Sequence, residues 1–383
     1  MRLALHGGFA EKGRTSLGIE TDGYHLLLDA GVKTSARGGA DYWPALRTEE
    51  LRALDAIVIT HAHEDHVAAL GWCIEHGFDG RIFMTPETAR ELDDGLAGYA
   101  EPSHSARVRA AHIETLPLGA DALRVGPLRV GTGRSGHVAG GVWCSITDAR
   151  TRVVYCSDVA PRSPVFAMDP LPRCDALVID ASYGDDATDA TTRAAAIAAW
   201  VGRHPGGCVL PTPLYGRSAE LLAIVPGLLA LAPGMREALG SQIDASAWLV
   251  DDVAARLTAR LAASVDWRPH DRLPNAALLC HDAMGLSGTS PEILRQVQAH
   301  RHPALFTGHL PAHSPGERMV ADDAAEWIRL PTHPTLPENL AIVAASGASL
   351  VIGHSCDADA LARLALRIPA LRVELATGDR IDC

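Results

Sequence analysis

The stretch His61-Ala62-His63-Glu64-Asp65-His66 decides the fold of this chain, because it puts three imidazoles and the Asp65 carboxylate within six residues. It follows an apolar strand predicted at 56–60 and precedes the predicted start of a helix at 67–71. Loops at the carboxyl ends of parallel strands are where α/β folds place their chemistry. Imidazole nitrogens and carboxylate oxygens are ligands of zinc. The stretch therefore predicts a metal site rather than a solvated His-rich loop.

Other segments place an acid or an imidazole directly after an apolar run. These residues are Asp29, His137 in a Gly-rich bend, Asp158 and His354. Each would lie at the same edge of a sheet, because each ends or follows a predicted strand. One such residue alone is more often a capping or solvated group. Together, in this order, they predict a site that is assembled from distant segments.

This pattern, His-x-His-x-Asp-His followed by the later residues, resembles the signature of the metallo-β-lactamase superfamily. The resemblance implies two Zn²⁺ ions per chain, with Mn²⁺ as the alternative metal. The implied ligands of the first metal are His61, His63 and His137. The implied ligands of the second metal are Asp65, His66 and His354, with Asp158 shared by both metals. Asp29 matches an early aspartate that supports the metal loop.

At 383 residues the chain is longer than one compact core, which predicts two domains. The resemblance implies an α/β fold, the αββα sandwich of the superfamily, with an inserted α/β domain. We expect residues 1–183 to form the first part of the sandwich, 184–317 the insertion and 318–383 the C-terminal part.

The insertion resembles the β-CASP branch of the superfamily, whose members are nucleases acting on RNA or DNA. The matching segments are a strand that leads to Asp180 and a Ser-Tyr-Gly turn, a Gly216-Arg217 helix start, and Pro331-Thr332-His333. The chain departs from the branch at His309, where a tyrosine is usual, and at Pro334. The inserted domain is also short.

The β-CASP resemblance implies a zinc-dependent phosphodiester hydrolase that uses a hydroxide held by two metals. Asp65 would orient that hydroxide or accept a proton. His333 would bind the phosphate or protonate the leaving oxygen. Asp180 would hold an imidazole by a hydrogen bond and so fix its tautomer. Single-stranded RNA is favoured over DNA as the substrate.

Composition limits the alternatives. The net charge is −12, and Lys12 and Lys33 are the only lysines, which argues against tight nonspecific binding of nucleic acid. Eight cysteines without a Cys-x-x-Cys pair indicate reduced thiols. No apolar run is long enough to span a bilayer, and the N-terminal residues do not look like a signal peptide. We therefore expect a soluble, cytoplasmic protein without a membrane partner.

Two other functions stay open. The acidic charge, the scarcity of lysine and the short insertion favour a metallo-hydrolase of a small molecule, such as a thioester, lactone or phosphodiester. A non-catalytic scaffold that binds RNA or a protein is the third hypothesis, and the intact set of ligand residues counts against it. A homodimer is also left open.

Overall fold

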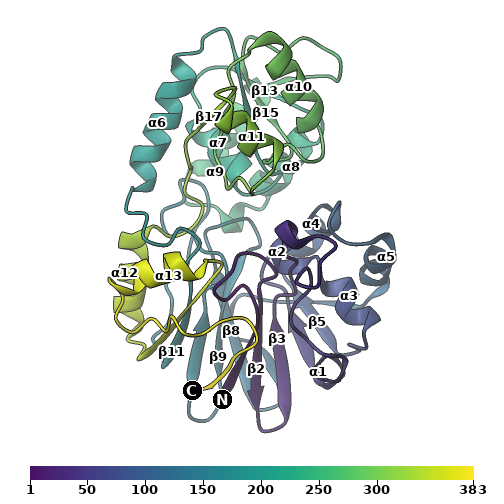
Figure 1. Ribbon diagram of the computed structural model, residues 1–383, viewed down its shortest axis with the longest axis vertical. Coiled ribbons are helices and arrows are strands. Elements are labelled where there is room, and N and C mark those ends of the chain that lie inside the picture. Colours follow the sequence, from purple (N-terminus) through teal and green to yellow (C-terminus); the bar gives the residue numbers. More distant parts are fainter. The chain divides into compact units, whose positions relative to one another are not determined.

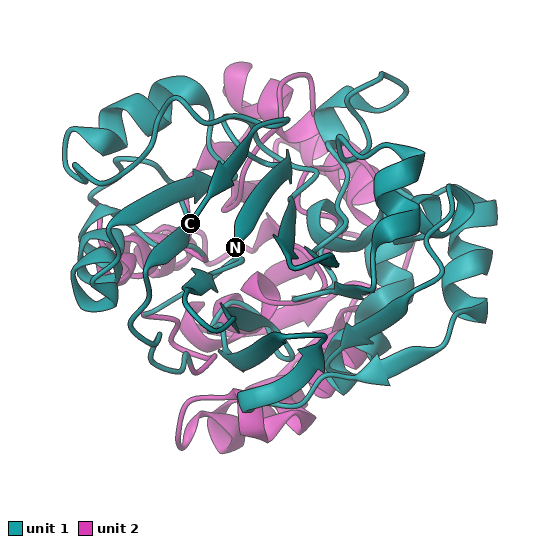
Figure 2. Cartoon of the chain, turned by 90° about the horizontal axis from the view of Figure 1, so that it is seen from below, with its two compact units in different colours: residues 1–161, 168–187, 333–383 teal, residues 162–167, 188–332 magenta.

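The computed structural model describes residues 1–383, which divide into two compact units (Figure 2). Unit 1 contains residues 1–161, 168–187 and 333–383, and unit 2 contains 162–167 and 188–332. The sequence predicts an insertion at 184–317. Unit 2 continues beyond it to Thr332, because β17 (Glu326–Trp327) pairs in parallel with β16 (Leu305–Phe306).

Unit 1 is built on two sheets (Figure 1). The first has the strand order β19 (Arg380–Asp382), β1 (Arg2–Gly7), β2 (Ser16–Thr21), β3 (Tyr24–Leu28), β4 (Ala56–Val58), β5 (Arg81–Met84) and β6 (Ile113–Thr115). The second has the order β18 (Leu350–His354), β11 (Ala176–Asp180), β10 (Arg152–Tyr155), β9 (Val142–Thr147), β8 (Leu128–Arg134) and β7 (Gly119–Val125). The helical elements of the unit are η1 (Thr34–Ala36), α1 (Thr48–Ala53), α2 (Glu64–Val67), α3 (Leu70–Glu75), α4 (Pro86–Leu96), α5 (Pro102–Ala110), α12 (Leu336–Ser346) and α13 (Ala358–Ala365).

The central strands of both sheets are buried on both faces, as strands between two other layers must be. In β4 every residue is fully buried. Leu27 and Ile57 pack into the apolar cluster under α3, α4 and α5, whereas Leu177 and Val351 pack into the cluster that includes residues of α13. The result is the layer order helix, sheet, sheet, helix, which confirms the αββα sandwich predicted from the sequence.

Strand direction brings the candidate site residues to one end of unit 1. β10, β11 and β18 are parallel neighbours, and Asp180 lies in register with His354 at their carboxyl ends. β8 runs in the same direction as β10, because each is antiparallel to β9. The loops that follow β8 and β10 therefore open at the end of the second sheet where β11 and β18 finish. The loop after β4 joins them there, because Thr60 O accepts a hydrogen bond from Val142 N at the start of β9.

Unit 2 has a sheet of its own, in which the strands are parallel. Its order is β12 (Cys208–Pro211), β15 (Ala277–Cys280), β13 (Leu229–Leu231) and β14 (Val265–Asp266). Its helical elements are α6 (Ala190–Gly202), α7 (Arg217–Ile224), α8 (Met235–Asp244), η2 (Ser246–Trp248), α9 (Val253–Ala263), α10 (Ser290–His300) and α11 (Pro315–Ala321). In the whole chain no helix combines the length and apolarity needed to cross a membrane.

Candidate metal centre

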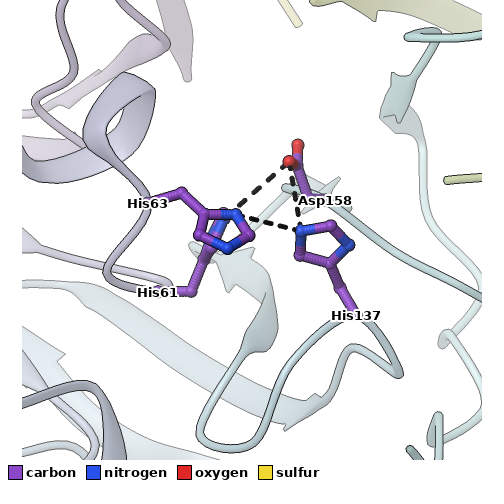
Figure 3. Close-up of side chains that lie close together, drawn as sticks. All are labelled: His61, His63, His137 and Asp158. Atoms are coloured by element: carbon purple, nitrogen blue, oxygen red, sulfur yellow. Dashed lines mark hydrogen bonds and ion pairs between the residues drawn. The ribbon is translucent and has the colours of Figure 1, made fainter. Parts of the chain in front are cut away.

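Three imidazoles and one carboxylate converge at the end of the sandwich where these strands finish. Figure 3 shows His61, His63, His137 and Asp158 pointing toward one another. One nitrogen of each imidazole and one Asp158 oxygen all lie within 4.8 Å of one another. His63 Nδ1 is 3.1 Å from His61 Nε2 and 3.2 Å from His137 Nε2. Asp158 Oδ2 is 3.8 Å from His61 Nε2 and 3.7 Å from His137 Nε2.

This donor set fits a divalent metal. Each nitrogen of a neutral imidazole offers either one N–H or one lone pair, so three ring nitrogens that face the same point cannot all be well paired with one another, whereas a cation between them could accept a lone pair from all three. Burial, followed by repulsion from neighbouring imidazoles, lowers the pKa of His61 and His63 well below the usual histidine value, which keeps both rings neutral. Neutral imidazoles are the form that binds metal.

A second group adjoins the first through the other oxygen of Asp158. His66 Nε2 is 3.3 Å from Asp158 Oδ1 and 4.0 Å from Asp65 Oδ2. Both His66 Nε2 and Asp158 Oδ1 are buried, and although they face each other they do not reach good hydrogen-bond geometry, an arrangement that a cation between them would improve. The carboxylate of Asp158 thus faces both groups, as a ligand shared by two metals would.

His354 is placed differently from the other predicted ligands. Its Nε2 lies 3.1 Å from the backbone oxygen of Ser157, and its Nδ1 lies 3.0 Å from Ser355 Oγ. Its role as a ligand of the second metal stays a prediction.

Asp180, which is buried, and His333, which is partly buried, form a pair beside the imidazole cluster. His333 Nδ1 is 2.9 Å from Asp180 Oδ2 and 3.7 Å from Asp158 Oδ2. The other Asp180 oxygen accepts from Ser182 N and Ser182 Oγ. Burial would lower the pKa of His333, but Asp180 and Asp158 outweigh it and raise that pKa to about 10. The hydrogen bond fixes Nδ1 on the Asp180 side of the ring, which turns Nε2 the other way.

Asp29 supports the site through hydrogen bonds to His66 and to two residues near the candidate ligands in the sequence. It is fully buried, and its carboxylate accepts hydrogen bonds from Thr60 N, Thr60 Oγ1, Tyr155 OH and His66 Nδ1, at 2.7 to 2.9 Å. A carboxylate on Nδ1 fixes the ring so that Nε2 faces Asp158. The sequence analysis missed Thr60 and Tyr155. Their positions at the ends of the strands that carry His61 and Asp158 were the available signal.

Comparison with known proteins agrees with this geometry. Residues 24–211 match the family described as "Beta-lactamase superfamily domain". Transcription termination factor FttA of Methanothermobacter thermautotrophicus is 29% identical over 250 residues, which cover 58% of this chain and 39% of that protein. Cleavage and polyadenylation specificity factor 73 of Drosophila melanogaster is 26% identical over 250 residues, covering 60% and 36%. Ribonuclease TTHA0252 of Thermus thermophilus is 27% identical over 197 residues, covering 48% and 44%.

The matches span less than half the length of each of these relatives. A crystal structure of a protein of unknown function from Enterococcus faecalis V583 superposes with a TM-score of 0.63 at 12% identity, and the match covers 99% of both chains. That likeness shows the fold over the whole chain. Residues 24–211 therefore form a domain of the metallo-β-lactamase superfamily, and the chain is similar to relatives from the β-CASP branch of that superfamily.

Proposed function

We propose that this chain is a metal-dependent phosphodiester hydrolase that cuts single-stranded RNA. The observation that carries the proposal is the position of Asp158 Oδ2, which lies 3.7 Å from His137 Nε2 and 3.7 Å from His333 Nδ1. A candidate phosphate-binding and proton-donating group thus adjoins the candidate metal centre. The names of the relatives, a ribonuclease among them, support RNA as the substrate.

The residues that would hold two Zn²⁺ ions are those of the two groups described above. His61, His63 and His137 would hold the first, Asp65, His66 and His354 the second, and Asp158 both. Divalent ions held there supply Lewis acidity and neutralise the charge of the phosphate. Mn²⁺ would serve through the same nitrogen and oxygen donors.

The side chains divide the remaining work between them. Asp180 holds His333 Nδ1, so His333 Nε2 is the atom that donates to a phosphate oxygen or gives a proton to the leaving oxygen. Asp65 keeps about a third of its side chain exposed, and its Oδ2 lies 4.0 Å from His66 Nε2. It is therefore placed to accept a proton from an attacking water at the solvent side.

Cleavage of 5′-labelled single-stranded RNA and of the matching DNA by the zinc-loaded protein tests this proposal. We expect His63→Ala to lose metal together with activity. We expect His333→Ala to retain metal and to lose about 10²–10⁴ in rate, the usual contribution of one general acid. His112→Ala is the matched control, because His112 is exposed. The size pattern of the RNA products would show whether cleavage is internal or starts from an end.

The alternative is hydrolysis of a small molecule, which the net charge of −12 and the presence of only two lysines favour. The small-molecule hypothesis would be supported if the metal-loaded protein left RNA and DNA intact but hydrolysed a thioester, a lactone or a small phosphodiester. That result would contradict the nuclease proposal. The cytoplasmic location and the homodimer stay predictions.

A further inference from the structure

A row of arginines crosses unit 1 at the end of the six-stranded sheet that lies opposite the candidate metal centre. Arg129 at the start of β8 and Arg152 at the start of β10 both lie in register with Thr147 of β9. Directly opposed residues of antiparallel strands share one face of the sheet. The two arginines therefore flank Thr147 on the same face, about 10 Å apart at the usual strand spacing.

The same end of the sheet carries a recess of about 490 Å³. Its charged lining consists of Arg129, Arg150, Arg152, Arg173, Asp148 and Asp175. All four arginines are exposed, and none of them forms an ion pair. The two carboxylates bind backbone amides: Asp148 accepts from Arg150 N and Thr151 N, and Asp175 accepts from Arg152 N. Asp148 also lies 3.8 Å from the N-terminal ammonium group of Met1.

Two of these guanidinium groups are held in place by neutral partners. Arg152 donates from Nε to Thr147 Oγ1 at 3.3 Å and from Nη1 to the backbone oxygen of Arg173 at 3.2 Å. Arg173 packs against Gly347, where a Cβ atom would lie 2.4 Å from Nη2. These contacts position positive charge without neutralising it, so the groups remain available to an anion.

The row also contains an unfavourable pair. Arg124 of β7 lies directly opposite Arg129, and like charges in that position destabilise a sheet. Arg124 is compensated by Asp121 at 2.9 Å, whereas Arg129 has no carboxylate partner. In a chain with a net charge of −12, this concentration of unpaired guanidinium groups is a local site of attraction for polyanions.

We propose that this recess binds the phosphate backbone of an RNA strand whose other part occupies the metal centre. This inference rests on the proposed function. Arg152 and Asp158 are separated by six positions along and beyond β10, which spans about 20 Å at the rise of an extended chain. A short RNA confined to the metal centre would not reach the arginines, whereas a long one would.

The test uses the zinc-loaded full chain and nuclease-resistant phosphorothioate RNAs of about 3 and about 30 nucleotides. At about 3.4 Å per phosphate the first spans about 10 Å, which is too short to reach the arginines from the metal centre, and the second spans about 100 Å. The variant is the triple substitution Arg129→Gln, Arg150→Gln, Arg173→Gln. The matched control carries Arg37→Gln, Arg52→Gln and Arg367→Gln, three exposed arginines without ion pairs. Fluorescence anisotropy gives Kd at several salt concentrations, and cleavage of unmodified RNA is measured in parallel.

We expect the recess variant to bind the long RNA at least tenfold more weakly. The slope of the logarithm of the binding constant against the logarithm of the salt concentration should become less steep by about 2, because three lost phosphate contacts contribute about 0.7 each. Binding of the short RNA should not change. Equal binding of the long RNA by the variant and the unaltered chain overturns the inference, as does an equal loss in the control. Failure of the unaltered chain to bind the long RNA also overturns it. If the chain cleaves RNA and the variant binds it unchanged, the nuclease proposal is supported and the recess proposal is wrong. If the variant loses binding but the unaltered chain does not cleave RNA, the recess proposal is supported and the nuclease proposal is wrong.

Discussion

Asp29 shows how a residue outside the set of candidate ligands can organise the members of that set. It adopts a left-handed backbone conformation, with φ of 64°, directly after β3. Its carboxylate ties together the ends of β3, β4 and β10 and fixes the His66 ring. Because all of these partners are buried, loss of the carboxylate would leave their donors without an acceptor.

Asp29→Asn should therefore weaken metal binding without removing any ligand. The amide puts an N–H donor where His66 Nδ1 and Tyr155 OH need an acceptor, so His66 loses its fixed orientation. We expect zinc affinity to fall about 10–100-fold, the usual cost of losing such a supporting partner. Competition with a coloured chelator measures it.

Asp22→Asn is the control, since Asp22 is an exposed aspartate that also has a positive φ, of 47°. An Asp29→Asn protein that binds zinc as tightly as the unaltered chain would contradict the supporting role.

At this scale the sequence predicted which side chains the structure brings together, but not all of their contacts. His61, His63, His66, His137 and Asp158 could be selected because each follows a strand of recognisable pattern. The contact of His354 with Ser157 could not be predicted, because Ser157 has a positive φ, of 54°, which is unusual for a residue other than glycine. The Asp180–His333 bond joins residues 153 positions apart, and only the family resemblance pointed to it.

Among the elements, α4 contains a buried carboxyl group, that of Glu91, which has no ion-pair partner. Glu91 is 4% exposed and forms no ion pair. Burial, followed by repulsion from Asp94 and Glu87, raises the pKa of Glu91 well above the ordinary value of 4.5. The folded chain therefore binds this proton more tightly than the unfolded chain does.

The sign of the resulting pH dependence follows from linkage. The stability due to protonated Glu91 is complete below the unfolded pKa of 4.5 and is lost as pH rises toward the folded pKa. We expect Glu91→Gln to leave stability unchanged near pH 4 and to raise it by about 1 kcal/mol or more near pH 8, since one pKa unit corresponds to 1.36 kcal/mol. Urea midpoints across this range measure the effect. Glu49→Gln, at an exposed position of α1, should give no such gain.

For the whole molecule, every candidate ligand lies in unit 1. The catalytic candidates Asp180 and His333 also lie in unit 1, in its second and third segments. The sequence predicted two domains and an interrupted ligand series. It could not predict that residues 162–167 would join unit 2, because they do so through a backbone bridge between Phe166 and the distant Leu249. Apolar periodicity carries no information about such a bridge.

Removal of metal should consequently affect one unit only. At a free metal concentration of about 100 times Kd, binding stabilises the folded state by about 2.7 kcal/mol, a factor of about 100 in the opening equilibrium. We expect a chelator to speed amide hydrogen exchange in β4, β10 and β18 by up to this factor, with β12 and β15 of unit 2 unchanged. Equal acceleration in β12 and β15 would contradict the assignment of the ligands to unit 1.

The order of the segments also sets the timing of assembly during synthesis. Asp158 precedes the whole of unit 2, and His333 follows it. The 175 positions between them take about 9 to 35 s to translate at about 5–20 residues per second. During this interval the nascent chain already exposes the imidazoles of the first group, while the strand that ends at His354 has not yet been made. The nascent chain thus contains all candidate ligands of the first metal well before Asp180 and His333 can form their pair.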